Sequence, residues 1–194
     1  VRREEQAWDP SVTVLLDSRA SAHAGNGRTA SFEWAISAAT SIAHHLIGNG
    51  FRLVMADAEG QVPTASAEDP FAAREAVLLA MTDEALSEQT GLDGALENNL
   101  ARSGEMLVAV LGRLTPDDVT ALATARHGRT VGMAVILDVD SFTIRGLRAA
   151  PEVLAQHESC VRQLADAQWR VVTARRGDEV ADVWAELERR GGAN

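Results

Sequence analysis

Val12-Thr13-Val14-Leu15-Leu16-Asp17-Ser18-Arg19-Ala20-Ser21 is the stretch of sequence that decides the fold. Its first five residues are nearly all apolar and rich in β-branched side chains, which is typical of a strand covered on both faces in a parallel sheet. The strand ends at Asp17, and a polar loop follows. Ligands of open α/β sheets bind beyond the carboxyl ends of the strands, where the strand order reverses.

Asp17 at that strand end has two interpretations. An aspartate there is well placed for metal, phosphate or proton chemistry. It can equally accept backbone N–H bonds and do no more than shape the loop that follows. Both interpretations remain open from this stretch alone.

The composition is that of a globular chain with an acidic balance. The 194 residues are 46% hydrophobic and 24% charged, which favours one domain over residues 1–194. The net charge of −10 disfavours nucleic acid and anionic membranes as partners, and it suits a basic protein surface or a cation. Cys160 is the single cysteine, so neither an internal disulfide nor a thiolate metal cluster is expected.

The sequence contains no run long enough for a membrane-spanning helix and no signal-peptide pattern. It begins at Val1 with a polar lead-in and without methionine. We therefore expect a soluble domain excised from a longer, membrane-anchored protein.

Strand and helix patterns alternate along the chain. Strands are predicted at residues 11–17, 51–56, 105–111, 130–137 and 169–173, and helices at 31–47, 69–82, 86–102, 116–126, 151–168 and 178–190. A short return strand at 61–65 would lie at the sheet border, because Pro63 confines it to an edge. The pattern predicts a Rossmann-like, three-layer, doubly wound α/β fold, with a mostly parallel sheet and one antiparallel edge strand.

Motifs for nucleotide binding and for serine hydrolases are missing. The sequence has no Gly-x-Gly-x-x-Gly after the first strand, no Gly-Lys-Ser/Thr and no Gly-x-Ser-x-Gly. Its five histidines lack the paired spacing of a metal site. The run Thr115-Pro116-Asp117-Asp118 has two neighbouring acids, but an N-cap, a proline and acids on the helix dipole explain it as a helix start.

Asp138-Val139-Asp140 follows the predicted strand 130–137 and offers an enzymatic alternative. It resembles the Asp-x-Asp nucleophile motif of haloacid-dehalogenase-type phosphatases, in which one aspartate attacks phosphorus and the other is the acid/base. A metal-assisted phosphohydrolase would then use Asp138, Asp140 and Asp17. The motif's place on a late strand, without a helix directly after it, favours a loop held by Asx turns instead.

The loop after the first strand resembles the Asp-x-Ser-x-Ser loop of von Willebrand A-like domains. That loop belongs to the metal-ion-dependent adhesion site, where oxygen ligands hold Mg²⁺. The resemblance implies Asp17 and Ser21 as metal ligands. Thr90-Gly91-Leu92-Asp93-Gly94-Ala95-Leu96 is similar to the family's threonine loop, which implies Thr90 as a further ligand.

Two positions depart from the family pattern, and both place an arginine near the predicted site. Arg19 replaces the middle serine, and Gly112-Arg113-Leu114 stands where an aspartate should follow the fourth strand. We therefore expect a degenerate site in which an arginine pairs with Asp17 as an internal salt bridge, in place of Mg²⁺.

The sequence resembles most closely the von Willebrand A-like carboxyl-terminal part of the bacterial domain of unknown function 58 family. The resemblance is carried by the opening residues, by the first strand and by Ser31-Phe32-Glu33-Trp34-Ala35-Ile36-Ser37-Ala38-Ala39. It implies a domain at the cytoplasmic face of a membrane that works with a MoxR-type AAA+ ATPase in chaperone-like assembly.

The sequence thus predicts a non-enzymatic protein-interaction module without a required cofactor. Its expected contact residues lie in the loops at the carboxyl ends of the strands: Asp17, Arg19, Ser21, Thr90 and Arg113. The phosphohydrolase built on Asp138 and Asp140 is the alternative, and a purely structural domain of a membrane protein is a third possibility.

Overall fold

A six-stranded sheet forms the middle layer of the computed structural model, which describes residues 10–62, 69–100, 106–126, 131–143 and 148–191. The strands follow one another across the sheet in the order β3-β2-β1-β4-β5-β6. Their bounds are β1 (Ser11–Leu16), β2 (Arg52–Asp57), β3 (Gly60–Gln61), β4 (Met106–Leu111), β5 (Val131–Leu137) and β6 (Arg170–Ala174).

The predicted mostly parallel sheet is confirmed. β1 pairs in parallel with β2 on one side and with β4 on the other, and β5 and β6 continue the parallel order. β3 is only two residues long and pairs antiparallel with β2, after a turn in which the Asp57 carboxylate accepts from the N–H groups of Glu59 and Gly60. Most of the predicted return strand, from residue 63, lies outside the described residues.

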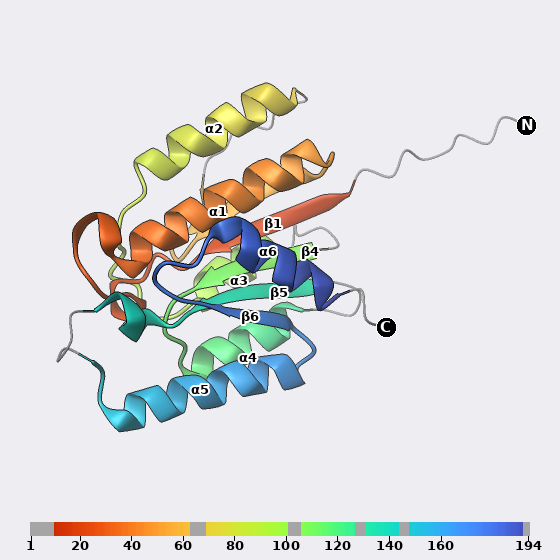
Figure 1. The fold of residues 1–194 in the computed structure, drawn as a ribbon. Helices are drawn as coiled ribbons and strands as arrows, with labels where there is room; N and C mark the ends of the chain where they lie inside the picture. Colours follow the sequence, from red (N-terminus) through yellow and green to blue (C-terminus); the bar gives the residue numbers. More distant parts are fainter. Residues whose placement is uncertain (1–9, 63–68, 101–105, 127–130, 144–147, 192–194) are drawn as a thin grey trace, which may run out of the picture.

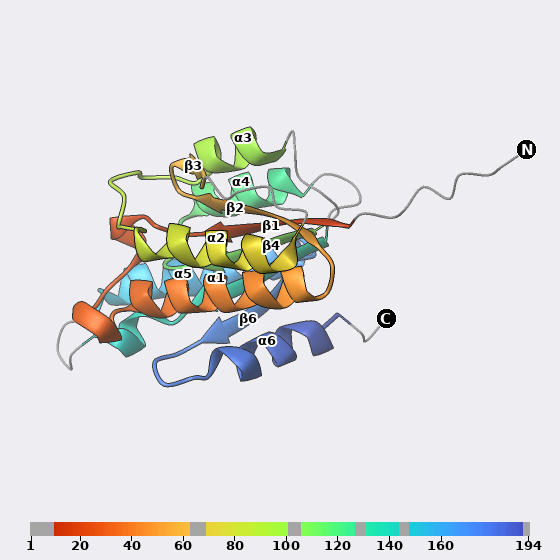
Figure 2. The ribbon, with the colours of Figure 1, turned by 90° about the horizontal axis from the view of Figure 1, so that it is seen from above.

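Helices cover both faces of the sheet and complete the three layers (Figure 1). Their bounds are α1 (Ser31–Gly48), α2 (Pro70–Thr82), α3 (Asp93–Leu100), α4 (Pro116–Ala125), α5 (Pro151–Asp166) and α6 (Val180–Arg189). α1 and α6 pack on one face, with α2 against α1, while α3, α4 and α5 cover the other face (Figure 2). The doubly wound arrangement expected from the alternating pattern is therefore present.

The two cores explain the continuous apolar run of the first strand. Val12, Val14 and Leu16 belong to the core under α1, and Leu15 belongs to the core on the opposite face. Successive strand residues point to opposite faces, so a strand between two helical layers needs apolar residues at nearly every position. All four of these side chains are at most 1% exposed.

The predicted helix over residues 86–102 is wrong in its first half. The helix α3 begins only at Asp93, and Ser87 instead forms an isolated parallel bridge with Arg19. The Ser87 N–H donates to the Ser18 carbonyl at 2.7 Å, and the Ser87 carbonyl accepts from the Ala20 N–H at 2.8 Å. Tertiary pairing therefore overrides the local helical pattern and holds residues 83–92 against the loop that follows β1.

None of the helices in the described residues is long and apolar enough to cross a lipid bilayer.

Gly132 in β5 provides a test of core packing. A Cβ at this position would lie 2.6 Å from a ring atom of Trp169, whose side chain is buried. Gly132→Ala should therefore lower the free energy of unfolding by roughly 1–3 kcal/mol through overpacking. Gly94→Ala is the control, since its Cβ meets no atom within 4 Å and alanine favours helix α3. Urea unfolding should show opposite signs for the two variants, and equal effects would contradict this packing.

Candidate functional site

The candidate site lies where the strand order reverses, between β1 and β4. β1 ends at Leu16, and the Asp17 N–H still donates to the Val110 carbonyl of β4 at 2.9 Å. This bond fixes Asp17 at the carboxyl end of the sheet, in the place where open α/β sheets bind their ligands. Asp17 is fully buried at this position.

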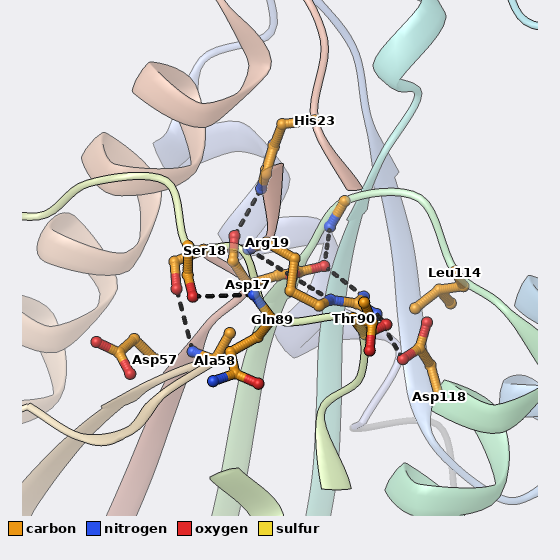
Figure 3. Close-up of polar contacts among 12 residues, drawn as sticks. Asp17, Ser18, Arg19, His23, Asp57, Ala58, Gln89, Thr90, Leu114 and Asp118 are labelled. Carbon is orange, nitrogen blue, oxygen red and sulfur yellow. Dashed lines mark hydrogen bonds and ion pairs between the residues drawn. The ribbon is translucent and has the colours of Figure 1, made fainter. Parts of the chain in front are cut away.

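The guanidinium of Arg19 lies between two carboxylates at this place (Figure 3). Its Nε and Nη2 donate to the two oxygens of Asp17, at 2.8 and 2.9 Å, in a bidentate pair. Its Nη1 donates to Oδ1 of Asp118 at 2.6 Å. The side chains of Asp17, Arg19 and Asp118 are 0%, 1% and 1% exposed, so the three charges form a buried cluster. The predicted salt bridge between Arg19 and Asp17 is confirmed.

Neutral donors complete the hydrogen bonding of the two carboxylates. The N–H groups of Gly112 and Arg19 donate to Asp17 at 3.1 and 3.3 Å. Oδ2 of Asp118 accepts from the N–H and the hydroxyl of Thr115, at 2.8 and 2.9 Å. Buried charges are tolerated when they are paired and hydrogen-bonded in this way.

The acidic partners keep Arg19 charged. Burial alone would lower the pKa of Arg19, but the hydrogen bonds and negative charges of Asp17 and Asp118 outweigh it and raise the pKa. The cluster therefore holds a permanent cation that is covalently part of the loop after β1.

His23 supports this loop as a neutral side chain. Its Nε2 lies 2.6 Å from the Asp17 carbonyl oxygen, and its Nδ1 lies 3.0 Å from the Ser31 hydroxyl. A carbonyl can only accept, so Nε2 carries the proton and Nδ1 accepts from Ser31. Burial lowers the pKa of His23, which favours this neutral form. His23 therefore has a structural role in this loop.

The predicted contact residues are divided between the interior and the surface. Asp17 and Arg19 are buried, so a partner reaches only the loop surface that they support. Ser21 is exposed in a 3-10 turn, and Thr90 is exposed while its carbonyl accepts from Arg19 Nη1 at 3.4 Å. Arg113 lies apart from the cluster and pairs with Asp140 at 2.8 Å.

Asp118 is the residue of the cluster that the sequence analysis missed. Its position after Thr115-Pro116 indicated a helix cap, and the structure confirms the capping box at the start of α4. The same carboxylate uses its other oxygen for Arg19, 99 residues earlier in the chain. No local sequence pattern indicates this second role of Asp118.

The aspartates of the Asp-x-Asp motif are also paired with arginines. Asp138 is 36% exposed and lies 3.3 Å from Arg175. Asp140 accepts from Arg113 at 2.8 Å and from the Ala149 N–H at 2.7 Å, and although burial would raise its pKa, these bonds hold the pKa below the ordinary value. Since Asp17 is bound to Arg19, none of the three carboxylates suggested for phosphohydrolase chemistry is free of an arginine.

The donor set at the cluster does not suit a divalent metal. The place that a cation would take between Asp17 and Asp118 is filled by the guanidinium, within hydrogen-bonding distance of both carboxylates. Over the described parts of the chain, no group of three or more His, Cys, Asp and Glu side chains could hold a metal ion. We derive no chemistry through Mg²⁺ for this site.

The buried cluster makes a direct prediction about stability. Arg19→Met leaves two buried carboxylates, Asp17 and Asp118, without a cation. This substitution should lower the free energy of unfolding by roughly 3–5 kcal/mol. The double variant Arg19→Met, Asp17→Asn should be less destabilised than Arg19→Met alone, because it removes one of the two unpaired buried charges. Arg113→Met is the control with a smaller loss, since Arg113 is 21% exposed. Chemical denaturation measures all three, and a loss for Arg19→Met no larger than that for Arg113→Met would contradict the cluster's role.

Glu84 in the segment that covers the cluster makes the stability depend on pH. Burial, together with the charges of Asp57 and Glu59, raises the pKa of Glu84 from 4.5 to about 7. The folded state then binds the proton more tightly than the unfolded chain. The stability contributed by Glu84 is fully present below pH 4.5 and is lost as the pH rises through about 7.

Glu84→Gln should therefore stabilise the protein above neutral pH by roughly 1 kcal/mol, a value reduced for solvent screening of this partly exposed group. Unfolding curves in acid and in mild base measure the difference, which should vanish in acid. Glu88→Gln, at an exposed position of the same segment, is the control. A stabilisation by Glu84→Gln that is equal at both pH values would refute this assignment.

Comparison with known proteins assigns no family to this geometry. The chain matches no protein-family model, and it matches none of the curated proteins. The function proposed below therefore rests on the contacts of the Asp17–Arg19–Asp118 cluster.

Proposed function

We propose that this chain is a von Willebrand A-like domain in which Arg19 replaces the metal ion of the adhesion site, and that it is a metal-independent protein-interaction module. One observation carries the proposal. A bidentate, fully buried arginine–aspartate pair occupies the strand-order reversal, where a ligand-binding α/β domain would hold its ion. The tethered cation supplies the positive charge that organises the loops.

The surface above the cluster has the features of a contact site. Residues 83–92 are fixed to the loop after β1 through Ser87, which also donates its hydroxyl to Glu59 at 2.8 Å. This segment presents Leu86, which is 48% exposed, beside the polar Gln89 and Thr90. This segment thus offers a partner one exposed apolar side chain beside polar groups. Ser21 lies exposed on the neighbouring turn.

The partner that we propose is a protein. The net charge of −10 suits a basic patch on that partner. The resemblance to the domain of unknown function 58 family suggests a MoxR-type AAA+ ATPase, reached from the cytoplasmic face of a membrane in a longer protein. Membership of that family and this location are parts of the proposal.

The proposal predicts which surface variants disrupt binding. Leu86→Glu and Thr90→Arg should each weaken binding to the ATPase at least about tenfold by interferometry, because they place charge and bulk in the contact. Leu79→Glu is the matched control, since Leu79 is 63% exposed but lies on α2.

Equal binding by Leu86→Glu and the wild type would contradict the proposal. Phosphomonoester hydrolysis that Asp138→Ala abolishes would instead support the enzymatic alternative built on Asp138 and Asp140.

A further inference from the structure

The outer edge of β6 pairs with no other strand in the part of the chain that the structure describes, although the Val171 carbonyl on this edge is bound by Arg190. β6 ends the sheet, pairing in parallel with β5 on its inner side, and no described strand pairs with its outer side. Figure 2 shows β6 at the border of the sheet with α6 beside it, and Figure 1 places α5 on the other face. An open strand edge offers main-chain donors and acceptors to an added strand.

Two hydrogen bonds identify which peptide groups face outward. The Ala174 carbonyl accepts from the Asp138 N–H at 2.8 Å, so Ala174 faces β5. The Val171 carbonyl accepts from Nη1 of Arg190 at 2.7 Å, so Val171 faces away from β5. Peptide groups alternate along a strand, and the N–H and C=O of Thr173 therefore point outward, like those of Val171. The Thr173 side chain is exposed as well.

A groove runs along this edge. A hollow of about 620 Å³ has Val161 and Ala165 of α5 as one wall, Glu186 and Arg190 as the other, and β6 between them. A second hollow of about 480 Å³ shares Arg162, Thr173 and Arg175 with the first and continues past the end of the strand. The shared residues place the two hollows next to each other along β6, and together they are called the groove.

The first hollow is basic on a chain that is acidic. Four arginines line it, namely Arg162, Arg170, Arg175 and Arg190, against two carboxylates, Asp178 and Glu186, whereas the second hollow has four arginines and three carboxylates. Arg190 is paired with Glu186 and Arg175 with Asp138, so Arg162 and Arg170 are the arginines of this hollow without a carboxylate partner among the described residues. The chain as a whole has a net charge of −10. This local reversal selects an anionic occupant by charge complementarity.

We propose that an extended acidic segment of a partner protein adds to the outer edge of β6. Its main chain pairs with Thr173, and its carboxylates contact Arg162 and take the place of Asp138 at the exposed Arg175. A second copy of this chain is disfavoured as the occupant, because edge-to-edge pairing would set arginines against arginines. This inference stands independently of the function proposed for the loops around Arg19.

The probes are fluorescent short peptides that alternate glutamate with valine, threonine or phenylalanine, and matched peptides with lysine for glutamate. At least one glutamate peptide should bind the full chain, and the lysine peptides should not. Arg162→Glu and Arg175→Glu should each weaken binding at least about tenfold by fluorescence polarisation. Arg28→Glu makes the same charge change at an exposed position outside the groove and should leave binding unchanged.

Thr173→Pro tests the main-chain pairing, since it removes an N–H that faces away from β5. It should weaken binding, whereas Thr173→Val, which keeps the N–H, should not. In NMR hydrogen exchange, the bound glutamate peptide should protect the Thr173 amide. Equal binding of lysine peptides, binding without protection of Thr173, or no binding by any glutamate peptide would overturn the proposal. The last result would mean that the arginines only guard the edge against aggregation.

Discussion

The ion pair that holds the guanidinium of Arg19 between Asp17 and Asp118 is the constraint on which the functional end of the sheet depends. This ion pair joins the end of β1 to the start of α4. Nη1 of Arg19 also donates to the carbonyl of Thr90. Three segments that are far apart in the sequence are thereby fixed at one point. Buried ion pairs contribute little net stability relative to apolar packing, but losing one partner is costly. The cluster therefore specifies one arrangement of the loops.

The same pairing recurs across the carboxyl edge of the sheet. Arg113, after β4, pairs with Asp140, and Arg175, after β6, pairs with Asp138. Asp17, Asp138 and Asp140 are thus each paired with an arginine of the chain itself. At these three positions the carboxylates are engaged by arginines and are not free to act as metal ligands or as acid/base groups.

The fold and the central ion pair could be predicted from the sequence, because their signals are local. The apolar run Val12–Leu16 predicts the buried strand, and Thr115-Pro116 predicts the start of α4. Arg19 lies two residues from Asp17, which makes their ion pair a local contact. Asp118 and the extended course of residues 86–92 could not be predicted in this way. The role of Asp118 depends on its contact with Arg19, and its local sequence indicates only a helix cap. The course of residues 86–92 depends on the pairing of Ser87 with Ser18, and its local sequence indicates a helix. The groove along β6 likewise exists only once α5 and α6 flank the strand.

The most direct test of this account is a thermal melt of the wild type and of Arg19→Ser, in EDTA and then with Mg²⁺. The account predicts that the wild type melts at the same temperature in both. Arg19→Ser restores Asp-x-Ser-x-Ser and leaves Asp17 and Asp118 without their cation, so it should melt lower in EDTA and recover with Mg²⁺. Saturation to about 100 times the dissociation constant would return roughly 2.7 kcal/mol. A wild type that Mg²⁺ stabilises, with the effect lost in Asp17→Ala, would contradict the claim that Arg19 has taken the place of the metal.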